Sequence, residues 1–461
     1  MKRRILVPCA LTMLAAFGCT SITQIRTVAP GAGGAGHADI LAPPKTDTAA
    51  FLDCRTGSPA KGENLRIIED YGNYVIGFAE FDDQGWAYQH DEQLAVINDR
   101  IQTELSNPDN AATDFLVLVF VHGWHHNAHD NDCNVQEFRQ MVRLAAEGTE
   151  AAIQQHKLVK HRRVLGIYVG WRGEAVTAPG LRYLTPVDRR NAAERVAKGS
   201  VRKLFANLHE QQIRAQRVRV DRMRTIVIGH SFGGLVAFSA LSQGELNDLT
   251  LTTSESPRFC DPRDPRHPAI TASPVWPDAL ILINPAFEAS RFEEFDRLVK
   301  GLTPCVPPAA KSNTLVVPSF MVITAENDIW TGKMFTVGRS VGTLFESYDR
   351  TNADATQTER LSNLHAIGFV PSYQTHRLDL NLETPPRAVA QLLPAVGSPL
   401  NAQSPVWVVR ASAAVVNGHT GFLYTRPKDK NPSPYLADWL LDIYDMDCGA
   451  APGMVNCTAA R

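Results

Sequence analysis

The sequence predicts an α/β protein built on a doubly wound, mainly parallel sheet. Short apolar runs of strand length recur along the chain, and stretches with helical periodicity separate them, which is the pattern of such sheets. The 461 residues are 44% hydrophobic and 20% charged, with a net charge of −2. This balance supports a sizeable core and excludes a wholly disordered chain. The chain also lacks the basic excess expected of a nucleic-acid-binding protein.

Residues 1–18 are predicted to be a signal peptide. Lys2, Arg3 and Arg4 precede an apolar run over 5–17 that is too short to span a bilayer comfortably. Gly18 and Cys19 then resemble the cleavage site of a bacterial lipoprotein signal, although the bulky Phe17 departs from that pattern. We therefore expect an exported protein, periplasmic or attached to the outer membrane through a lipid on Cys19. The alternative is a simple secreted protein in which Cys19 has no special role.

Residues 19–61 are rich in Ala, Gly, Pro and Thr and are expected to form a flexible tether. The rest of the chain, 62–461, is expected to form one domain with insertions near 174–223 and 339–404. Six cysteines remain in addition to Cys9 and Cys19, an even number in a compartment that permits disulfides. Their spacing does not fix the pairing.

The first elements of the domain are a strand and a helix. Residues 74–81 have the aromatic and β-branched content of a strand, and a turn is expected at 82–85. Residues 91–105 then place Leu94, Ile97, Ile101 and Leu105 at helical spacing.

Alternation of strands and helices continues to the end of the domain. The run at 115–121 is apolar throughout, as in a strand buried on both faces of a parallel sheet. Further strands are expected at 164–169, 225–228, 279–283, 320–323 and 406–409, and further helices at 135–153, 187–213 and 235–241.

The sharpest motif is Gly-His-Ser-Phe-Gly at 229–233, which lies between the expected strand at 225–228 and the following helix. A serine on such a sharp turn presents its hydroxyl above the sheet edge, and the flanking glycines remove side chains that would collide there. The start of the helix also favours developing negative charge. Ser231 is therefore the candidate nucleophile. The alternative is that His230 and Ser231 merely cap the helix.

With this motif, the chain resembles the α/β-hydrolase superfamily, in particular bacterial serine hydrolases of the lipase and esterase type. Residues 229–234 match the nucleophile elbow, and Phe-Val-His-Gly-Trp at 120–124 resembles the His-Gly segment after the third strand of that fold. The resemblance extends over about 65–445. It implies that the backbone amides of Trp124 and Phe232 form the oxyanion hole.

A serine nucleophile also needs a general base and a carboxylate that orients this base, and the superfamily order is serine, acid, histidine. Asp328 follows the strand at 320–323, where the resemblance places the acid; Glu288 is the alternative, and Glu326 is a near neighbour. His419 lies beyond the last strand, between two glycines, where the fold delivers its base. The other candidate bases are His365 and His376.

Two further clusters suggest other roles. Four histidines, His122, His125, His126 and His129, lie beside Asp130 and Asp132 and could hold a metal ion. No His-Glu-x-x-His sequence accompanies them.

Residues 181–224 carry twelve cationic against four acidic side chains, so this run either approaches anionic groups or is the solvated face of packed helices.

Together these features predict an exported serine hydrolase that cleaves carboxylic esters through an acyl-enzyme on Ser231, with His419 as base, Asp328 as acid, and small-molecule or lipid esters as substrates. No cofactor, metal or nucleic acid is implied. The alternatives are a catalytically silent, membrane-tethered binding protein of the same fold and a metal-dependent hydrolase that uses the cluster from His122 to His129.

Overall fold

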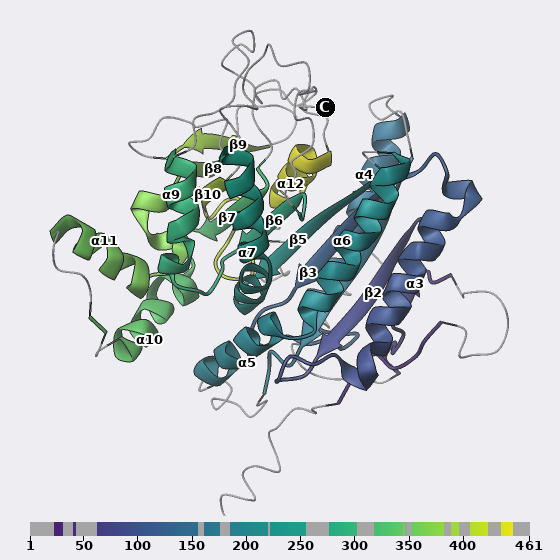
Figure 1. Cartoon of the computed structure of the whole chain (residues 1–461), viewed down its shortest axis with the longest axis horizontal. Helices are drawn as coiled ribbons and strands as arrows, with labels where there is room; N and C mark the ends of the chain where they lie inside the picture. The colour runs from purple at the N-terminus through teal and green to yellow at the C-terminus, as the bar shows by residue number, and fades with distance from the viewer. Residues whose placement is uncertain are drawn as a thin grey trace, which may run out of the picture.

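A computed structural model describes residues 23–30, 40–42, 62–154, 161–175, 185–219, 222–254, 276–301, 318–343, 346–347, 353–381, 389–395, 406–422 and 435–445. These residues form one ten-stranded sheet in the order β1-β2-β4-β3-β5-β6-β7-β10-β8-β9 (Figure 1). The strands from β2 to β8 in this order pair in parallel, and only the outermost strands, β1 and β9, pair antiparallel. The prediction of an α/β fold with a mainly parallel sheet is confirmed.

The seven predicted strands are all present, and two of them have the predicted bounds. The ten strands are β1 (Ile68–Asp70), β2 (Tyr74–Phe81), β3 (Asp114–Val121), β4 (Arg162–Trp171), β5 (Met223–His230), β6 (Ala279–Ile283), β7 (Phe320–Ala325), β8 (His376–Asn381), β9 (Val389–Pro394) and β10 (Val406–Ala411). Strands β1, β8 and β9 were not predicted from the sequence.

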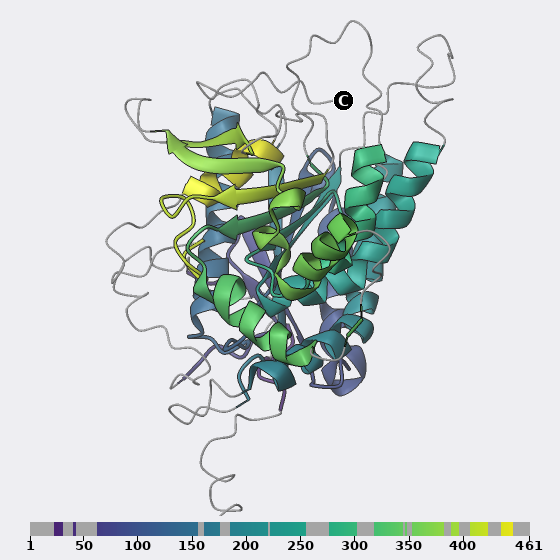
Figure 2. The same cartoon turned by 90° about the vertical axis from the view of Figure 1, so that its left-hand side faces the viewer.

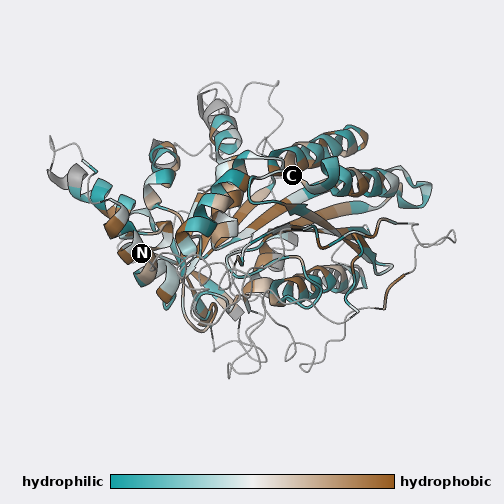
Figure 3. Ribbon diagram, turned by 90° about the horizontal axis from the view of Figure 1, so that it is seen from below, coloured by the Kyte–Doolittle hydropathy of each residue, from teal (hydrophilic) through white to brown (hydrophobic). Residues whose placement is uncertain are grey.

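Helices cover both faces of the sheet, as Figures 1 and 2 show. They are α3 (Glu92–Ser106), α4 (Cys133–Gln154), α5 (Pro186–Lys198), α6 (Val201–Val218), α7 (Phe232–Ser254), α9 (Glu293–Gly301), α10 (Phe335–Gly342), α11 (Ala353–Leu364) and α12 (Tyr435–Asp445). One apolar core lies between the sheet and α3, α5, α6 and α7, and a second lies between the sheet and α4 and α12. Figure 3 shows the strands as a largely hydrophobic layer between helices with hydrophilic surfaces.

The predicted helix at 187–213 is two helices, because the chain bends at Gly199. A Cβ at Gly199 would lie 2.1 Å from the carbonyl oxygen of Gly85, in the turn after β2. The amide of Ser200 donates to that same carbonyl, at 2.7 Å. Gly85 has φ = 89°, which disfavours residues with a side chain. The close contact of two backbones therefore ends α5 and starts α6, although periodicity alone favoured one helix.

The two predicted insertions contain regular structure. The first, near 174–223, includes α5 and α6, and α6 packs beside β5 as part of the connection from β4. The second, near 339–404, includes most of α10, α11, and strands β8 and β9, which extend the sheet beyond β10.

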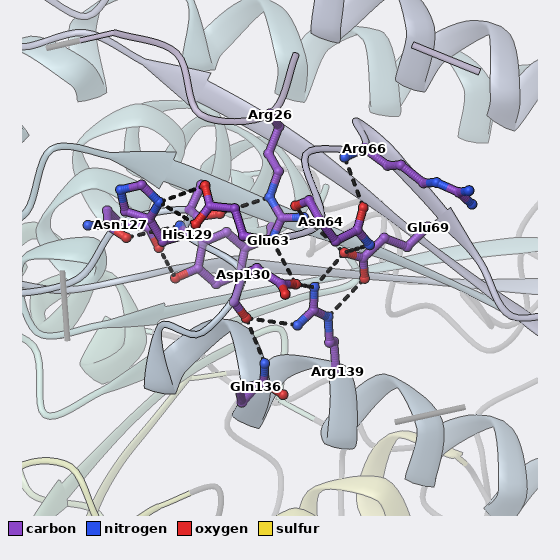
Figure 4. A network of polar contacts seen from close by, with 12 residues as sticks. Arg26, Glu63, Asn64, Arg66, Glu69, Asn127, His129, Asp130, Gln136 and Arg139 are labelled. Atoms are coloured by element: carbon purple, nitrogen blue, oxygen red, sulfur yellow. Dashed lines mark hydrogen bonds and ion pairs between the residues drawn. The ribbon is translucent and has the colours of Figure 1, made fainter. Parts of the chain in front are cut away.

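Part of the predicted tether is packed against the domain. Arg26 is fully buried, and its guanidinium donates to Glu69 at 3.0 Å and to the carbonyl of Ala128 at 2.8 Å. The amides of Ile25 and Arg26 donate to the carboxylate of Glu80. Figure 4 shows Arg26 and Arg139 converging on Glu69. Residues of the segment 23–30 thus lie against the domain, where the buried charge of Arg26 and its partners hold the chain.

The signal peptide, Cys19 and the rest of the tether except residues 40–42 lie outside the described residues. Cys133 forms a disulfide, and every other cysteine of the chain is outside the described part as well. Within the described segments, no helix has the length and apolar character that crossing a membrane requires.

Candidate active site

The serine motif forms a strained turn between β5 and α7. Ser231 has φ = 55°, which is unusual for a residue with a side chain. A Cβ at Gly229 would lie 2.7 Å from the carbonyl oxygen of Gly233, and one at Gly233 would lie 2.0 Å from that of Val121. Both glycines are therefore required by close backbone contacts. The turn sets Ser231 at the carboxyl edge of the sheet, as the motif predicted.

Ser231, His419 and Asp328 are joined by a continuous chain of hydrogen bonds. Nε2 of His419 lies 2.9 Å from Oγ of Ser231, and Nδ1 of His419 lies 2.8 Å from Oδ2 of Asp328. The three residues follow β5, β7 and β10, which end at the same edge of the sheet. This geometry lets His419 accept the serine proton at Nε2 while its Nδ1–H donates to Asp328.

Asp328 remains ionised because its hydrogen bonds outweigh its burial. Burial alone would raise the pKa of this carboxyl, but the His419 ring and the hydroxyl and amide of Thr331 hold the pKa below its usual value. The amide of Trp330 also donates to Oδ1 of Asp328, at 2.9 Å. A carboxylate held in this way fixes the orientation and tautomer of the imidazole.

Two buried residues that the sequence did not single out hold the histidine loop. The backbone carbonyl of His419 accepts from Nε2–H of His230 at 2.8 Å and from Nδ2–H of Asn284 at 2.9 Å. Asn284 also donates to the carbonyl of Gly418, and its Oδ1 accepts from the amide of Ala325 at 2.8 Å. Asn284 therefore connects the ends of β6 and β7 to the loop that carries His419.

His230 stays neutral beside the imidazole of His419. Burial is the main cause that lowers the pKa of His230 well below its usual value, and the neighbouring His419 lowers it further. The two rings lie 4.9 Å apart. A neutral His230 donates one hydrogen bond to the loop without repelling an imidazolium at His419. The sequence places His230 directly before Ser231. Its hydrogen bond to the carbonyl of His419 is seen only in the fold.

The segment expected to supply the oxyanion hole lies against the serine. A Cβ at Gly123 would be 2.8 Å from Cβ of Ser231, so the chain before Trp124 passes directly over the nucleophile. The Trp124 ring lies 6.5 Å from that of Phe232, and its Nε1–H donates to Thr185. Phe232 is the first residue of α7, where backbone amides have no partner within the helix. Both residues expected to supply donors are thus beside Ser231.

The other candidate acids and bases lie in different surroundings. Glu288 forms ion pairs with Arg190, Arg291 and Arg339. Oε1 of Glu326, an exposed residue, accepts from the amide of Ala413.

His365 bonds through Nδ1 to the hydroxyl of Thr336, and His376 is buried against Trp407. Neither histidine takes the place of His419 beside Ser231.

The histidine cluster is distributed among separate partners. Nδ1 of His122 bonds the carbonyl of Gly123, and its Nε2 accepts from the amide of Trp171; burial lowers the pKa of this histidine to about 4. His126 bonds Asp132, and His129 bonds Glu63. The ring of His125 stacks on that of Trp124 at 3.9 Å. Among the described residues, no three potential metal ligands converge.

Cations of the run at 181–224 form local contacts. Arg189 pairs with Asp83, Arg219 with Asp114, and Lys203 with Asp91, while Arg195 donates to the carbonyl of Asp83. These contacts join α5 and α6 to the turn after β2, to the residue before α3 and to the start of β3. In the described residues, these cations of the run therefore lie on helices that are packed against the rest of the domain.

Comparison with known proteins gives limited similarity. No family model matches the chain, and no curated protein matches it. Two solved structures of phospholipase PlaB from Legionella pneumophila, one in complex with thio-NAD, have TM-scores of 0.22 and 0.23 and sequence identities of 13% and 12%. The match covers 61% of this chain and 50% or 49% of the phospholipase, so this chain spans about half of its length. At this level of similarity, function has to be inferred from the residues of the site.

Proposed function

We propose that this protein is a serine hydrolase of the α/β-hydrolase type that cleaves carboxylic esters through an acyl-enzyme on Ser231. The observation that carries the proposal is the chain of hydrogen bonds from Ser231 through His419 to Asp328, at 2.9 and 2.8 Å. The strained turn at Ser231 supports it, because a sharp turn of this kind holds the serine hydroxyl at the end of the strand, within hydrogen-bond distance of His419.

In the acylation step, Oγ of Ser231 attacks the ester carbonyl carbon while Nε2 of His419 takes the hydroxyl proton. Charge that develops on the carbonyl oxygen is stabilised by the amides of Trp124 and Phe232. The carbon–oxygen bond to the alcohol then breaks, and His419 returns its proton to that leaving oxygen. Asp328 stays ionised and stabilises the transient imidazolium.

In the second step, water replaces the alcohol. His419 removes a proton from the water as it attacks the acyl-enzyme, and the proton passes to Oγ of Ser231 when the acyl bond breaks. The products are a carboxylic acid and the regenerated serine. No group other than the residues of this chain and water is needed for the balance of the reaction.

A fluorophosphonate probe tests the proposal, because it forms a covalent bond only with an activated serine. We expect labelling of the full-length wild type, loss of labelling in Ser231→Ala, and hydrolysis of a soluble short-chain ester that the same substitution abolishes. Ser239→Ala, in α7 and away from the turn, is the matched control and should label as the wild type does. A folded wild-type protein that neither labels nor hydrolyses esters would instead favour a catalytically silent binding protein.

A further inference from the structure

A row of exposed apolar side chains begins next to the candidate active site. Trp330, Met334, Val337 and Val341 lie along one side of the π-helical turn η5 (Trp330–Met334) and of α10, and they are between 40% and 69% exposed. We call these four residues the apolar row. Phe335 and Arg339 point the other way, since Phe335 packs on the core and Arg339 bonds Glu288. The row is therefore the outer side of a helix whose inner side is already packed.

The row is continuous with the site itself. The ring of Trp330 meets that of Trp124 edge to face at 5.7 Å, and the amide of Trp330 bonds Asp328. Ile329, also exposed, stands between Asp328 and the row. A ligand that covers the row therefore lies beside the entrance to Ser231.

Other exposed apolar residues lie at the same edge of the sheet. Trp86, 67% exposed, is in the turn after β2, and Val187, 72% exposed, is in the first turn of α5, two residues after the Thr185 that bonds Trp124. Figures 1 and 2 both place α5 and α10 along the lower end of the molecule. Large apolar side chains exposed together in this way mark an interaction surface.

The N-terminal segment also reaches this edge. Ile25 and Arg26 are bonded to Glu80, which lies one residue before the carboxyl end of β2. Cys19 and Ile25 are only six positions apart, and a chain of this length reaches at most about 20 Å. An anchor at Cys19, or in the apolar run at 5–17, would keep the carboxyl edge close to a membrane.

We propose that the apolar row, with Trp86 and Val187, docks on a phospholipid surface and that the esters cleaved at Ser231 are taken from that surface. Trp, Met and aliphatic side chains on one face of a helix suit the boundary between headgroups and acyl chains. Residues 329–343 include Lys333 and no carboxylate, which favours a surface that contains anionic lipid. The statement about the substrate rests on the proposed ester hydrolysis, whereas the statement about docking does not.

Quenching by brominated phospholipids tests the docking. Vesicles of phosphatidylcholine and phosphatidylglycerol, with bromines on the acyl chains, are added to the full chain and to variants that all retain residues 1–22, so any anchoring by that segment is common to all. We expect quenching of tryptophan fluorescence in the wild type, and loss of most of it in Trp86→Phe/Trp330→Phe, which removes both tryptophans of the proposed docking surface. Trp276→Phe is the control, because Trp276 precedes β6 at the opposite edge. Equal quenching in the two variants, or none in the wild type, would overturn the proposal.

Hydrolysis of esters tests the substrate. In Met334→Ser/Val337→Ser/Val341→Ser, the ratio of activity on vesicle-bound ester to activity on soluble ester should fall roughly tenfold, equivalent to about 1.4 kcal/mol. The control Ile213→Ser/Val218→Ser removes exposed apolar groups of α6 and should keep the wild-type ratio. An unchanged ratio in the triple variant contradicts surface-derived substrates. If the wild type cleaves no ester at all, the proposed function fails, and the quenching experiment still decides on docking.

Discussion

At the scale of single residues, the candidate site depends on one histidine in a loop. His419 contacts both Ser231 and Asp328, whereas His365 bonds Thr336. We expect His419→Ala to lower the turnover of a soluble ester by several orders of magnitude, because the serine then lacks its base. His365→Ala should retain most activity. Steady-state kinetics on both variants, with circular dichroism to verify folding, make the measurement; an inactive His365→Ala beside an active His419→Ala would contradict the assignment.

Asn284 offers a second prediction at this scale. In Asn284→Asp, the oxygen that accepts from Ala325 is preserved, but the amide donor becomes a carboxylate oxygen that faces the carbonyls of Gly418 and His419. The histidine loop should shift, and kcat should fall tenfold or more, roughly 1.4 kcal/mol or above, with little change in KM. Asp is tolerated at the positive φ of 44° nearly as well as Asn.

Asn327→Asp is the matched control for this prediction. Asn327 accepts from the amide of Gly418 through Oδ1, which an aspartate also supplies. Its Nδ2 donates to the side chain of Asn417, an exposed amide that can rotate and donate to the new carboxylate instead. This variant should keep kcat near the wild-type value. If Asn284→Asp is equally active, Asn284 fills space and does not position the loop.

The candidate triad could be predicted from the sequence because each member follows an apolar run of strand length. Parallel strands end at one edge, so residues that follow them meet there. His230 and Asn284 could not be predicted as a pair. Their common partner is a backbone carbonyl 189 and 135 residues away, and no local pattern marks such a contact.

At the scale of elements, the buried strands were predictable, whereas the edges were not. Strands β2 and β6 are apolar enough to read directly. Strand β8, by contrast, reads His-Arg-Leu-Asp-Leu-Asn, with polar residues on its exposed side, and only its pairing with β10 and β9 makes it a strand. The bend between α5 and α6 likewise depends on contact between Gly199 and Gly85, which are distant in sequence.

The N-terminal segment gives the prediction for an element. Arg26→Met keeps a long apolar side chain beside Phe78 but removes the guanidinium that lies over this ring, leaving Glu69 and the carbonyl of Ala128 with fewer partners. We expect the free energy of unfolding to fall by about 3 kcal/mol, as when one member of a buried ion pair is removed. Urea denaturation measures this change.

The control for the segment is an exposed ion pair. Lys203 bonds Asp91 with its side chain 57% exposed, so Lys203→Met should change the free energy of unfolding by less than about 1 kcal/mol. Similar values for Lys203→Met and Arg26→Met would mean that residues 23–30 do not stabilise the domain.

At the scale of the whole molecule, two apolar cores hold the sheet from both faces, while the carboxyl edge combines the strained serine turn and the exposed apolar row. The two cores stabilise the fold. The carboxyl edge departs from ordinary folding preferences, because Ser231 has a positive φ and the side chains of the apolar row are exposed. Such departures are expected where function opposes stability. The periodicity of apolar residues in the sequence predicts the two cores. At the carboxyl edge, the sequence predicts only the serine turn, through the motif at 229–233.

Buried histidines make the free energy of unfolding of the whole domain depend on pH. Burial lowers the pKa of His122 and of His376 to about 4, whereas both titrate near 6.5 in the unfolded chain. The unfolded state therefore binds more protons below about pH 6.5, and the free energy of unfolding decreases as the pH falls towards 4. Each histidine contributes up to about 3 kcal/mol to this decrease. The raised pKa values of Glu80 and Asp278 act in the opposite direction.

A single variant separates the contribution of one histidine from these opposing effects. His376→Leu removes a titrating ring that is buried against Trp407 and leaves the carboxyls unchanged. Because a leucine binds no proton in either state, the loss of stability between pH 7 and pH 4.5 should be smaller than in the wild type, by an amount on the order of 2 kcal/mol. Urea denaturation of both proteins at the two pH values gives the difference. An identical pH dependence in the two proteins would show that His376 is not held neutral by the fold.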